Sequence, residues 1–143
     1  MSSGAEPPIR RLVLDTSAYS WMRSGHARVL DLVAAAEIVI LPVTVLGELE
    51  AGFELGSRPR ENRTVLAEFL AEPFVSVRPV TPDTARRYGE VFAHLRRAAT
   101  PIPVNVVWIA AATLDCGGHL LTFDGHYNSI PALASTVLDV VES

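Results

Sequence analysis

Short apolar runs alternate with amphipathic stretches along most of the chain. The apolar runs are bounded by Gly, Pro or polar residues, which is typical of buried strands. They predict five strands, at residues 11–15, 37–41, 74–80, 119–123 and 136–141. Between them, apolar residues recur at three- and four-residue spacing and predict helices at residues 17–23, 26–36, 44–56, 58–72, 81–98 and 105–117.

This alternation indicates the fold class. Strands that alternate with helices pair in parallel, and the helices cover both faces of the sheet. We therefore expect an α/β fold, a three-layer α/β/α sandwich around a central, mostly parallel five-stranded sheet. The 143 residues suffice for one domain, which we place at residues 11–143, after a flexible extension of residues 1–10.

Several helix ends carry local signals. Thr81 followed by Pro82 is the expected pairing of a cap residue with the first helical position. Gly56 is suited to end a helix, and Asn105 is expected to cap the helix that runs to the glycines at 117 and 118.

The composition excludes several classes of protein. Hydrophobic residues make up 49% of the chain and the mean hydropathy is +0.27, which excludes an intrinsically disordered chain. No apolar run approaches the ~20 residues of a membrane helix, and residues 1–8 lack the layout of a signal peptide. The single cysteine, Cys116, cannot form an internal disulfide. We expect a cytoplasmic protein without membrane contact.

The basic residues are all arginines. Twelve of them against sixteen acids give a net charge of −4, which argues against coating nucleic acid by bulk charge. The absence of lysine excludes P-loop and Schiff-base chemistry. Arginines gather in the middle of the chain, and each is either a phosphate contact or simply part of a solvated helix face. The candidates for phosphate contact are Arg58, Arg60, Arg63, Arg86, Arg87, Arg96 and Arg97.

Three acidic residues are expected at one edge of the sheet. Asp15 ends the first strand, Asp124 follows the fourth, and Glu48 lies one turn into the helix after the second. Parallel sheets bind ligands at the carboxyl ends of their strands. Carboxylates gathered there repel one another unless cations neutralise them or a proton is shared. Oxygen donors without a Cys/His cluster favour Mg²⁺ or Mn²⁺ over zinc.

Each of these acids also has an ordinary structural interpretation. Asp15 is well placed to cap the next helix, Glu48 is typical of an exposed helix face, and Asp124 favours a turn. Their common position at one edge of the sheet is what favours a functional site, because three unrelated cap or turn residues need not coincide there.

Four segments resemble the ordered motif set of PIN domains, and most closely that of the VapC-type toxins of bacterial toxin–antitoxin pairs. They read VLDTSA at 13–18, VTVLGELEAGF at 43–53, IPVNVVWIAA at 102–111 and LLTFDGHY at 120–127. The resemblance spans nearly the whole chain. It implies a PIN-like fold and a metal-dependent endoribonuclease, a hydrolase that uses Mg²⁺ or Mn²⁺.

The resemblance also implies roles for individual residues. At the matching positions, the catalytic and metal-binding acids would be Asp15, Glu48 and Asp124. Polar neighbours that orient these acids or bound water would be Thr16, Thr122 and Asn105.

One position departs from the family pattern. The segment that resembles N-D-x-W-I-A-A has Val106 where the pattern has its third acid, and valine cannot bind a metal. The next acid along, Asp115, lies nine residues on, towards the other end of the same helix. We therefore expect impaired activity, whether the chain is a naturally weakened enzyme or carries an inactivating substitution.

The resemblance further implies partners. They are an RNA substrate, a VapB-type antitoxin that blocks the acidic pocket, and a second copy of the chain in a homodimer. The alternative, favoured by Val106, is a catalytically inactive PIN module that binds RNA or sequesters the antitoxin. A receiver-type phosphoacceptor domain is disfavoured because the chain has no lysine.

Overall fold

The computed structural model describes residues 7–140. Within this range the chain forms five strands, six α-helices and one 3₁₀ helix. In chain order they are β1 (Arg11–Leu14), α1 (Thr16–Arg23), α2 (Ala27–Ala35), β2 (Ile38–Pro42), α3 (Val43–Leu55), α4 (Pro59–Leu70), β3 (Val75–Arg78), α5 (Pro82–Arg97), α6 (Val104–Cys116), β4 (His119–Thr122), η1 (Gly125–Ser129) and β5 (Ser135–Val137).

The five strands form one sheet in the order β3-β2-β1-β4-β5, and every neighbouring pair is parallel. In the central strand β1, Leu12 pairs with Val39 of β2 on one side and with His119 of β4 on the other. Helices cover both faces, so Leu12, Val13 and Leu14 are fully buried. The expected α/β fold is confirmed, and the sheet is parallel throughout.

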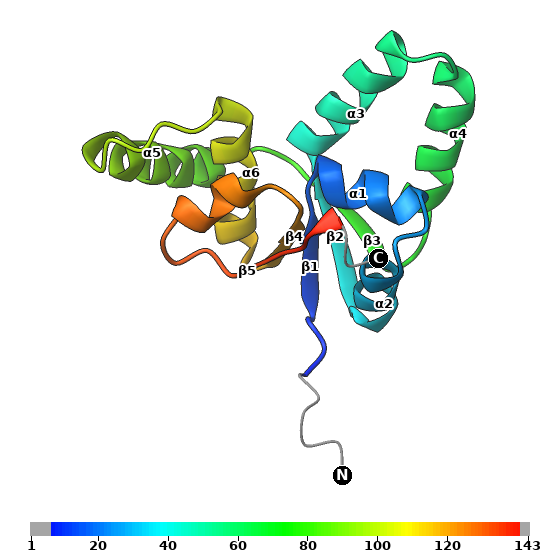
Figure 1. The fold of residues 1–143 in the computed structure, drawn as a ribbon, viewed down its shortest axis with the longest axis horizontal. Coiled ribbons are helices and arrows are strands. Elements are labelled where there is room, and N and C mark those ends of the chain that lie inside the picture. Colours follow the sequence, from blue (N-terminus) through cyan, green and yellow to red (C-terminus); the bar gives the residue numbers. More distant parts are fainter. Residues whose placement is uncertain (1–6, 141–143) are drawn as a thin grey trace.

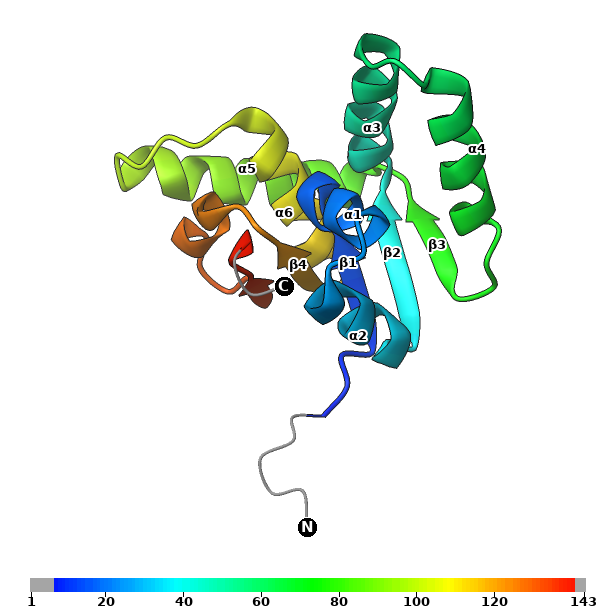
Figure 2. The same ribbon diagram turned by 45° about the vertical axis from the view of Figure 1, so that its right-hand side comes forward.

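The helices form the two outer layers. The chain passes from β1 to β2 and on to β3 in one direction across the sheet, then returns to β4 on the other side of β1. Right-handed crossovers therefore place α1 to α4 on one face and α5 and α6 on the other. In Figure 1 these two groups lie on opposite sides of the strands. Figure 2 shows α3 leaving the carboxyl end of β2 and extending with α4 beyond the sheet.

Three predicted details are wrong. The second strand does not end at residue 41: Pro42 is the last residue of β2 and pairs with Arg78, at the end of the ladder. Helix α6 begins at Val104 with Pro103 at the cap position, so Asn105 does not cap it and its side chain bonds elsewhere. Strand β5, an edge strand, ends at Val137 rather than at residue 141, which lies outside the described residues.

Part of the predicted N-terminal extension contacts the domain. The Arg10 carbonyl accepts a hydrogen bond from the Ile38 N–H, and Ile9 packs against the core. The remainder of the prediction, residues 1–6, lies outside the described residues. No helix between residues 7 and 140 has both the length and the apolar character needed to span a membrane.

Candidate functional site

One pocket of about 280 Å³ lies at the carboxyl edge of the sheet. Its walls come from the starts of α1, α6 and η1 and from the first half of α3, which the parallel topology brings together. The pocket contains all three predicted acids. Its lining residues are Asp15, Thr16, Ser17, Glu48, Asn105, Val106, Ile109, Asp124 and Tyr127.

Asp15 is the most buried of the three acids, at 4% exposure. Oδ1 accepts hydrogen bonds from the Ala18 N–H at 2.8 Å and from the Ser17 hydroxyl at 2.7 Å, and Oδ2 accepts one from Thr122. Burial raises the pKa of Asp15 and the charge of Asp124 adds to this, while the three hydrogen bonds oppose it. Asp15 therefore both caps α1 and presents a carboxylate to the pocket.

Glu48 is held at both carboxylate oxygens. Thr16 donates its hydroxyl proton to Oε1, and the Asn105 amide donates to Oε2 at 2.5 Å. These bonds join α3 to the first residue of α1 and the first turn of α6. A solvated glutamate on an open helix face has no such partners, so the simple surface interpretation of Glu48 is wrong.

Asp124 lies at the cap position of η1 and is partly exposed. Its Oδ1 accepts a hydrogen bond from the His126 N–H at 2.9 Å and lies 2.8 Å from Nδ1 of the same histidine. Its own N–H donates to the hydroxyl of Thr122, which also bonds Asp15. Thr122, fully buried at the end of β4, thus connects the two aspartates.

Val106 forms an apolar part of the pocket wall. It is 3% exposed and lines the pocket beside Ile109, one turn further along α6. The position expected to carry a third acid therefore does face the pocket, but with methyl groups. Asp115 does not replace it, because its carboxylate bonds Arg78 at 3.1 Å and Thr84 at 2.9 Å.

Tyr127 also lines the pocket, and the sequence pattern did not mark it as a site residue. Its side chain is 2% exposed. Burial raises the pKa of its phenol far above the ordinary value, and the charges of Asp15, Asp124 and Glu48 add to the effect. The available signal was its position three residues after Asp124, in the turn that follows β4.

The donor chemistry of this pocket suits a hard divalent cation. Its candidate ligands are carboxylate oxygens, which Mg²⁺ and Mn²⁺ prefer, and among the described residues no thiolate or imidazole lines it. As the side chains lie, no three Asp, Glu, His or Cys residues of the described part are arranged to hold a metal ion. Binding one would require the acids to give up some of the hydrogen bonds described above.

The candidate RNA-binding arginines lie outside the pocket lining. Four of them form ion pairs on exposed helix surfaces: Arg58 with Glu61, Arg63 with Glu50 and Glu54, Arg86 with Asp83, and Arg87 with Glu90. Within residues 7–140, no ion pair engages Arg60, Arg96 or Arg97.

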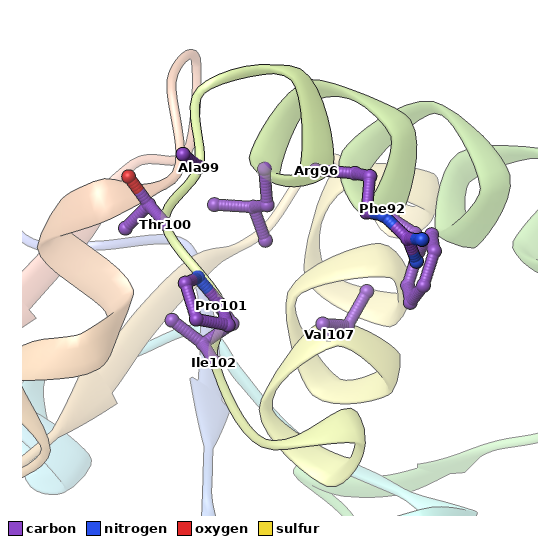
Figure 3. Close-up of a pocket in the computed structure, with 8 residues that line it drawn as sticks. Phe92, Arg96, Ala99, Thr100, Pro101, Ile102 and Val107 are labelled. Atoms are coloured by element: carbon purple, nitrogen blue, oxygen red, sulfur yellow. The ribbon is translucent and has the colours of Figure 1, made fainter.

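A larger cavity of about 430 Å³ lies between α5, the following loop and α6 (Figure 3). Its walls are mainly apolar, with Phe92, Ile102 and Val107 prominent, and Arg96 contributes the one charged lining side chain in the described structure. Among the residues that the structure describes, no carboxylate, thiol or imidazole lines it. The smaller acidic pocket is therefore the better candidate for chemistry.

Comparisons with known proteins agree with the fold and the motifs. Residues 12–133 match the PIN domain family. The chain is 29% identical over 125 residues to Ribonuclease VapC5 of Mycobacterium tuberculosis, an alignment that covers 86% of this chain and 90% of that protein.

Solved structures show the same fold. VapBC2 from Rickettsia felis, bound to a DNA fragment from its promoter, matches with a TM-score of 0.79 and 20% identity, over 90% of this chain and 99% of that one. VapBC-5 of Mycobacterium tuberculosis, from the VapBC family of toxin–antitoxin systems, matches with a TM-score of 0.69 and 24% identity, over 91% and 98%.

Proposed function

Since this chain belongs to the PIN-domain family, we propose that it is the toxin of a toxin–antitoxin pair, an endoribonuclease that hydrolyses RNA phosphodiester bonds. The observation that carries the proposal is the common pocket of Asp15, Glu48 and Asp124, which come from three distant parts of the chain. The similarity to a mycobacterial ribonuclease along most of both chains supports it.

PIN nucleases use divalent metal ions, and we assign Mg²⁺ or Mn²⁺ to this site from its oxygen donors. Asp15 and Asp124 would hold the ion, whose positive charge would offset the charge that builds on the phosphate. Glu48 would accept a proton from the attacking water. Thr122 bonds both the Asp15 carboxylate and the Asp124 backbone N–H and so fixes the two aspartates relative to each other, while Thr16 and Asn105 orient Glu48.

Val106 lowers the expected activity of this chain. It supplies an apolar wall where a further carboxylate would hold a second ion, and the described structure offers no neighbouring acid to compensate. By analogy with the removal of other groups that stabilise a transition state, we expect the reduction in rate to be on the order of 100-fold or more.

The test compares RNA cleavage by the unmodified chain and by Val106→Asp, in Mg²⁺ and in Mn²⁺. We expect Val106→Asp to cleave total RNA at discrete sites, which sequencing of the products would map, and the unmodified chain to cleave weakly. Val106→Asn is the matched control, because asparagine has the shape of aspartate but no charge. Adding Asp15→Asn to the active variant should abolish cleavage. Equal rates for the unmodified chain and Val106→Asp would contradict the assignment of the missing acid.

The proposed partners follow from the same relationship. The related VapBC structures support a VapB-type antitoxin as a partner, and we propose that it covers the acidic pocket. We further propose an RNA substrate, a homodimer and a cytoplasmic location. Purification of the chain with its chromosomal neighbour, followed by size-exclusion chromatography with light scattering, would test the antitoxin and the dimer.

A second candidate function is a non-catalytic module that binds RNA or sequesters the antitoxin. The observation that favours it is again Val106, buried in the pocket wall. Titration of Mn²⁺ followed by calorimetry separates the two functions. RNA binding without Mn²⁺ binding, together with no cleavage by Val106→Asp, would favour the second.

A further inference from the structure

Tyr127 is fixed in place beside Asp124. It lies in the middle of η1, where its N–H donates to the Asp124 carbonyl at 3.4 Å and its own carbonyl accepts from Ile130 at 3.2 Å. The ring is 2% exposed, so the core holds it on one side while the pocket lies on the other. The phenol therefore has a defined position relative to the acids, independent of any ligand.

The hydroxyl of Tyr127 differs from the other hydroxyls of the pocket. Thr16 donates to Glu48, and Ser17 donates to Asp15. In residues 7–140 the Tyr127 hydroxyl makes no hydrogen bond, although it lies near enough to all three acids to be affected by their charges. The hydroxyl is not one of the buried, unpaired polar atoms of the described residues, so although the ring is buried, the hydroxyl opens onto the pocket. A tyrosine usually places its hydroxyl where it can form a hydrogen bond, which a phenylalanine at this position could not form.

The charge of the pocket indicates what kind of partner is missing. Three carboxylates line it, and within the described residues no arginine or histidine does. A phosphate group that approaches these acids therefore needs neutral donors as well as a metal ion. Asn105 already uses its amide on Glu48, which leaves the Tyr127 hydroxyl as the lining hydroxyl free to donate.

We propose that the Tyr127 hydroxyl donates a hydrogen bond to a non-bridging phosphate oxygen of RNA bound in this pocket. This hydrogen bond deepens the proposed nuclease function and rests on it. It makes Tyr127 a catalytic residue in the strict sense, a group that touches the substrate, because the bond strengthens as negative charge accumulates on the phosphate. The phenol keeps its proton and serves only as a donor.

Tyr127→Phe tests the hydrogen bond, because it removes one oxygen and keeps the ring. The substitution is made in the Val106→Asp variant and compared with that parent, and Tyr88→Phe in the same parent is the matched control. Tyr88 lies on α5, stacks on Trp108 at 4.1 Å between ring centroids, and does not line the pocket. Cleavage of the mapped RNA gives kcat and KM, calorimetry gives Mn²⁺ affinity, and thermal melting gives stability.

We expect Tyr127→Phe to lower kcat/KM on the order of 10- to 100-fold. Its Mn²⁺ affinity should stay within about twofold, and its melting temperature should be unchanged or higher, since the hydroxyl has no partner within the described residues. In the unmodified chain, Tyr127→Phe should also weaken binding of a labelled, mixed-sequence RNA oligonucleotide measured by fluorescence anisotropy. Tyr88→Phe should match its parent in cleavage and in binding.

Several results would overturn the proposed hydrogen bond. If Tyr127→Phe cleaves as fast as its parent while Val106→Asp is active, the nuclease stands and the hydrogen bond is wrong. Loss of Mn²⁺ affinity would make Tyr127 a ligand or a support of the acids instead, and a lowered melting temperature would make its hydroxyl structural. If Val106→Asp neither binds nor cleaves RNA, the proposed function itself fails, and the hydrogen bond fails with it.

Discussion

The side-chain amide of Asn105 lies 2.5 Å from Oε2 of Glu48, although the two residues are 57 positions apart. The bond connects the first turn of α6 to α3, and Asn105 directly precedes Val106 in the chain. It therefore fixes the Glu48 carboxylate beside the valine that stands where the family pattern has an acid. We expect the proposed metal binding to depend on Asn105 as well as on the acids.

Replacing Asn105 tests its positioning role. In the Val106→Asp background, Asn105→Ala should lower Mn²⁺ affinity and cleavage by about 10-fold, the lower end of the usual effect of losing a partner that orients a ligand. Calorimetry and RNA cleavage measure the two quantities. Because Asn105 is exposed, the melting temperature should change little. Asn105→Gln, which keeps the amide, should recover part of the loss. Unchanged metal affinity in the alanine variant would contradict the role.

Val106→Asp should make stability depend on metal. The new carboxylate would be buried in a wall that already faces three acids, which should cost about 2–4 kcal/mol of the free energy of unfolding without metal. Mn²⁺ at 100 times its dissociation constant should raise the free energy of unfolding of this variant by about 2.7 kcal/mol. Urea denaturation with and without Mn²⁺ measures both values. The uncharged Val106→Asn control should show a smaller loss and little response to Mn²⁺.

The Asp115 carboxylate should stabilise the folded protein only while it is ionised, so its contribution should disappear at low pH. Burial alone would raise its pKa, but hydrogen bonds from Arg78 and Thr84 and the charges of Arg78 and Arg87 outweigh burial and lower it below 3.8. A lowered folded-state pKa means that the contribution is complete above about pH 4–5 and is lost as pH falls through the folded pKa.

Asp115→Asn should therefore destabilise the protein by about 1–3 kcal/mol at pH 7. The difference from the unmodified chain should shrink as the pH is lowered from about 5 to about 3. Urea denaturation across that range measures it. A difference that stays constant with pH would show that packing rather than the Arg78–Asp115 pair causes the loss.

The arginines without ion pairs should matter most for RNA binding. Arg96 and Arg97 near the end of α5 are free to meet phosphates in the described structure, whereas Arg86 and Arg87 are paired with Asp83 and Glu90. Replacing Arg96 and Arg97 by Ala should weaken RNA binding. It should also reduce the slope of log affinity against log salt by roughly 0.7 for each phosphate that an arginine no longer neutralises.

The matched control replaces Arg86 and Arg87 by Ala, and it should have a smaller effect on both quantities. Fluorescence anisotropy at several salt concentrations measures the slope. Equal effects of the two double substitutions would mean that the ion pairs do not decide which arginines contact RNA.

Local pattern was sufficient to predict the fold. Strands β1, β2 and β4 are short apolar runs, and Thr81 with Pro82 and Gly56 mark helix ends where the structure has them. The prediction failed where a residue had competing uses. Asn105 is a good cap by type, yet Pro103 takes the cap position and the amide bonds Glu48. Such choices depend on a helix from another part of the chain.

By itself, then, the amino-acid sequence determined the order of the elements and the placement of Asp15 and Asp124 at strand ends, because hydrophobic periodicity and turn residues act over a few positions. Only the tertiary structure decided which groups the acids bond, which arginines are paired, and that the unpaired Tyr127 hydroxyl belongs to the same pocket. Those interactions depend on how helices rotate and cross over the sheet, and packing between distant segments sets that geometry.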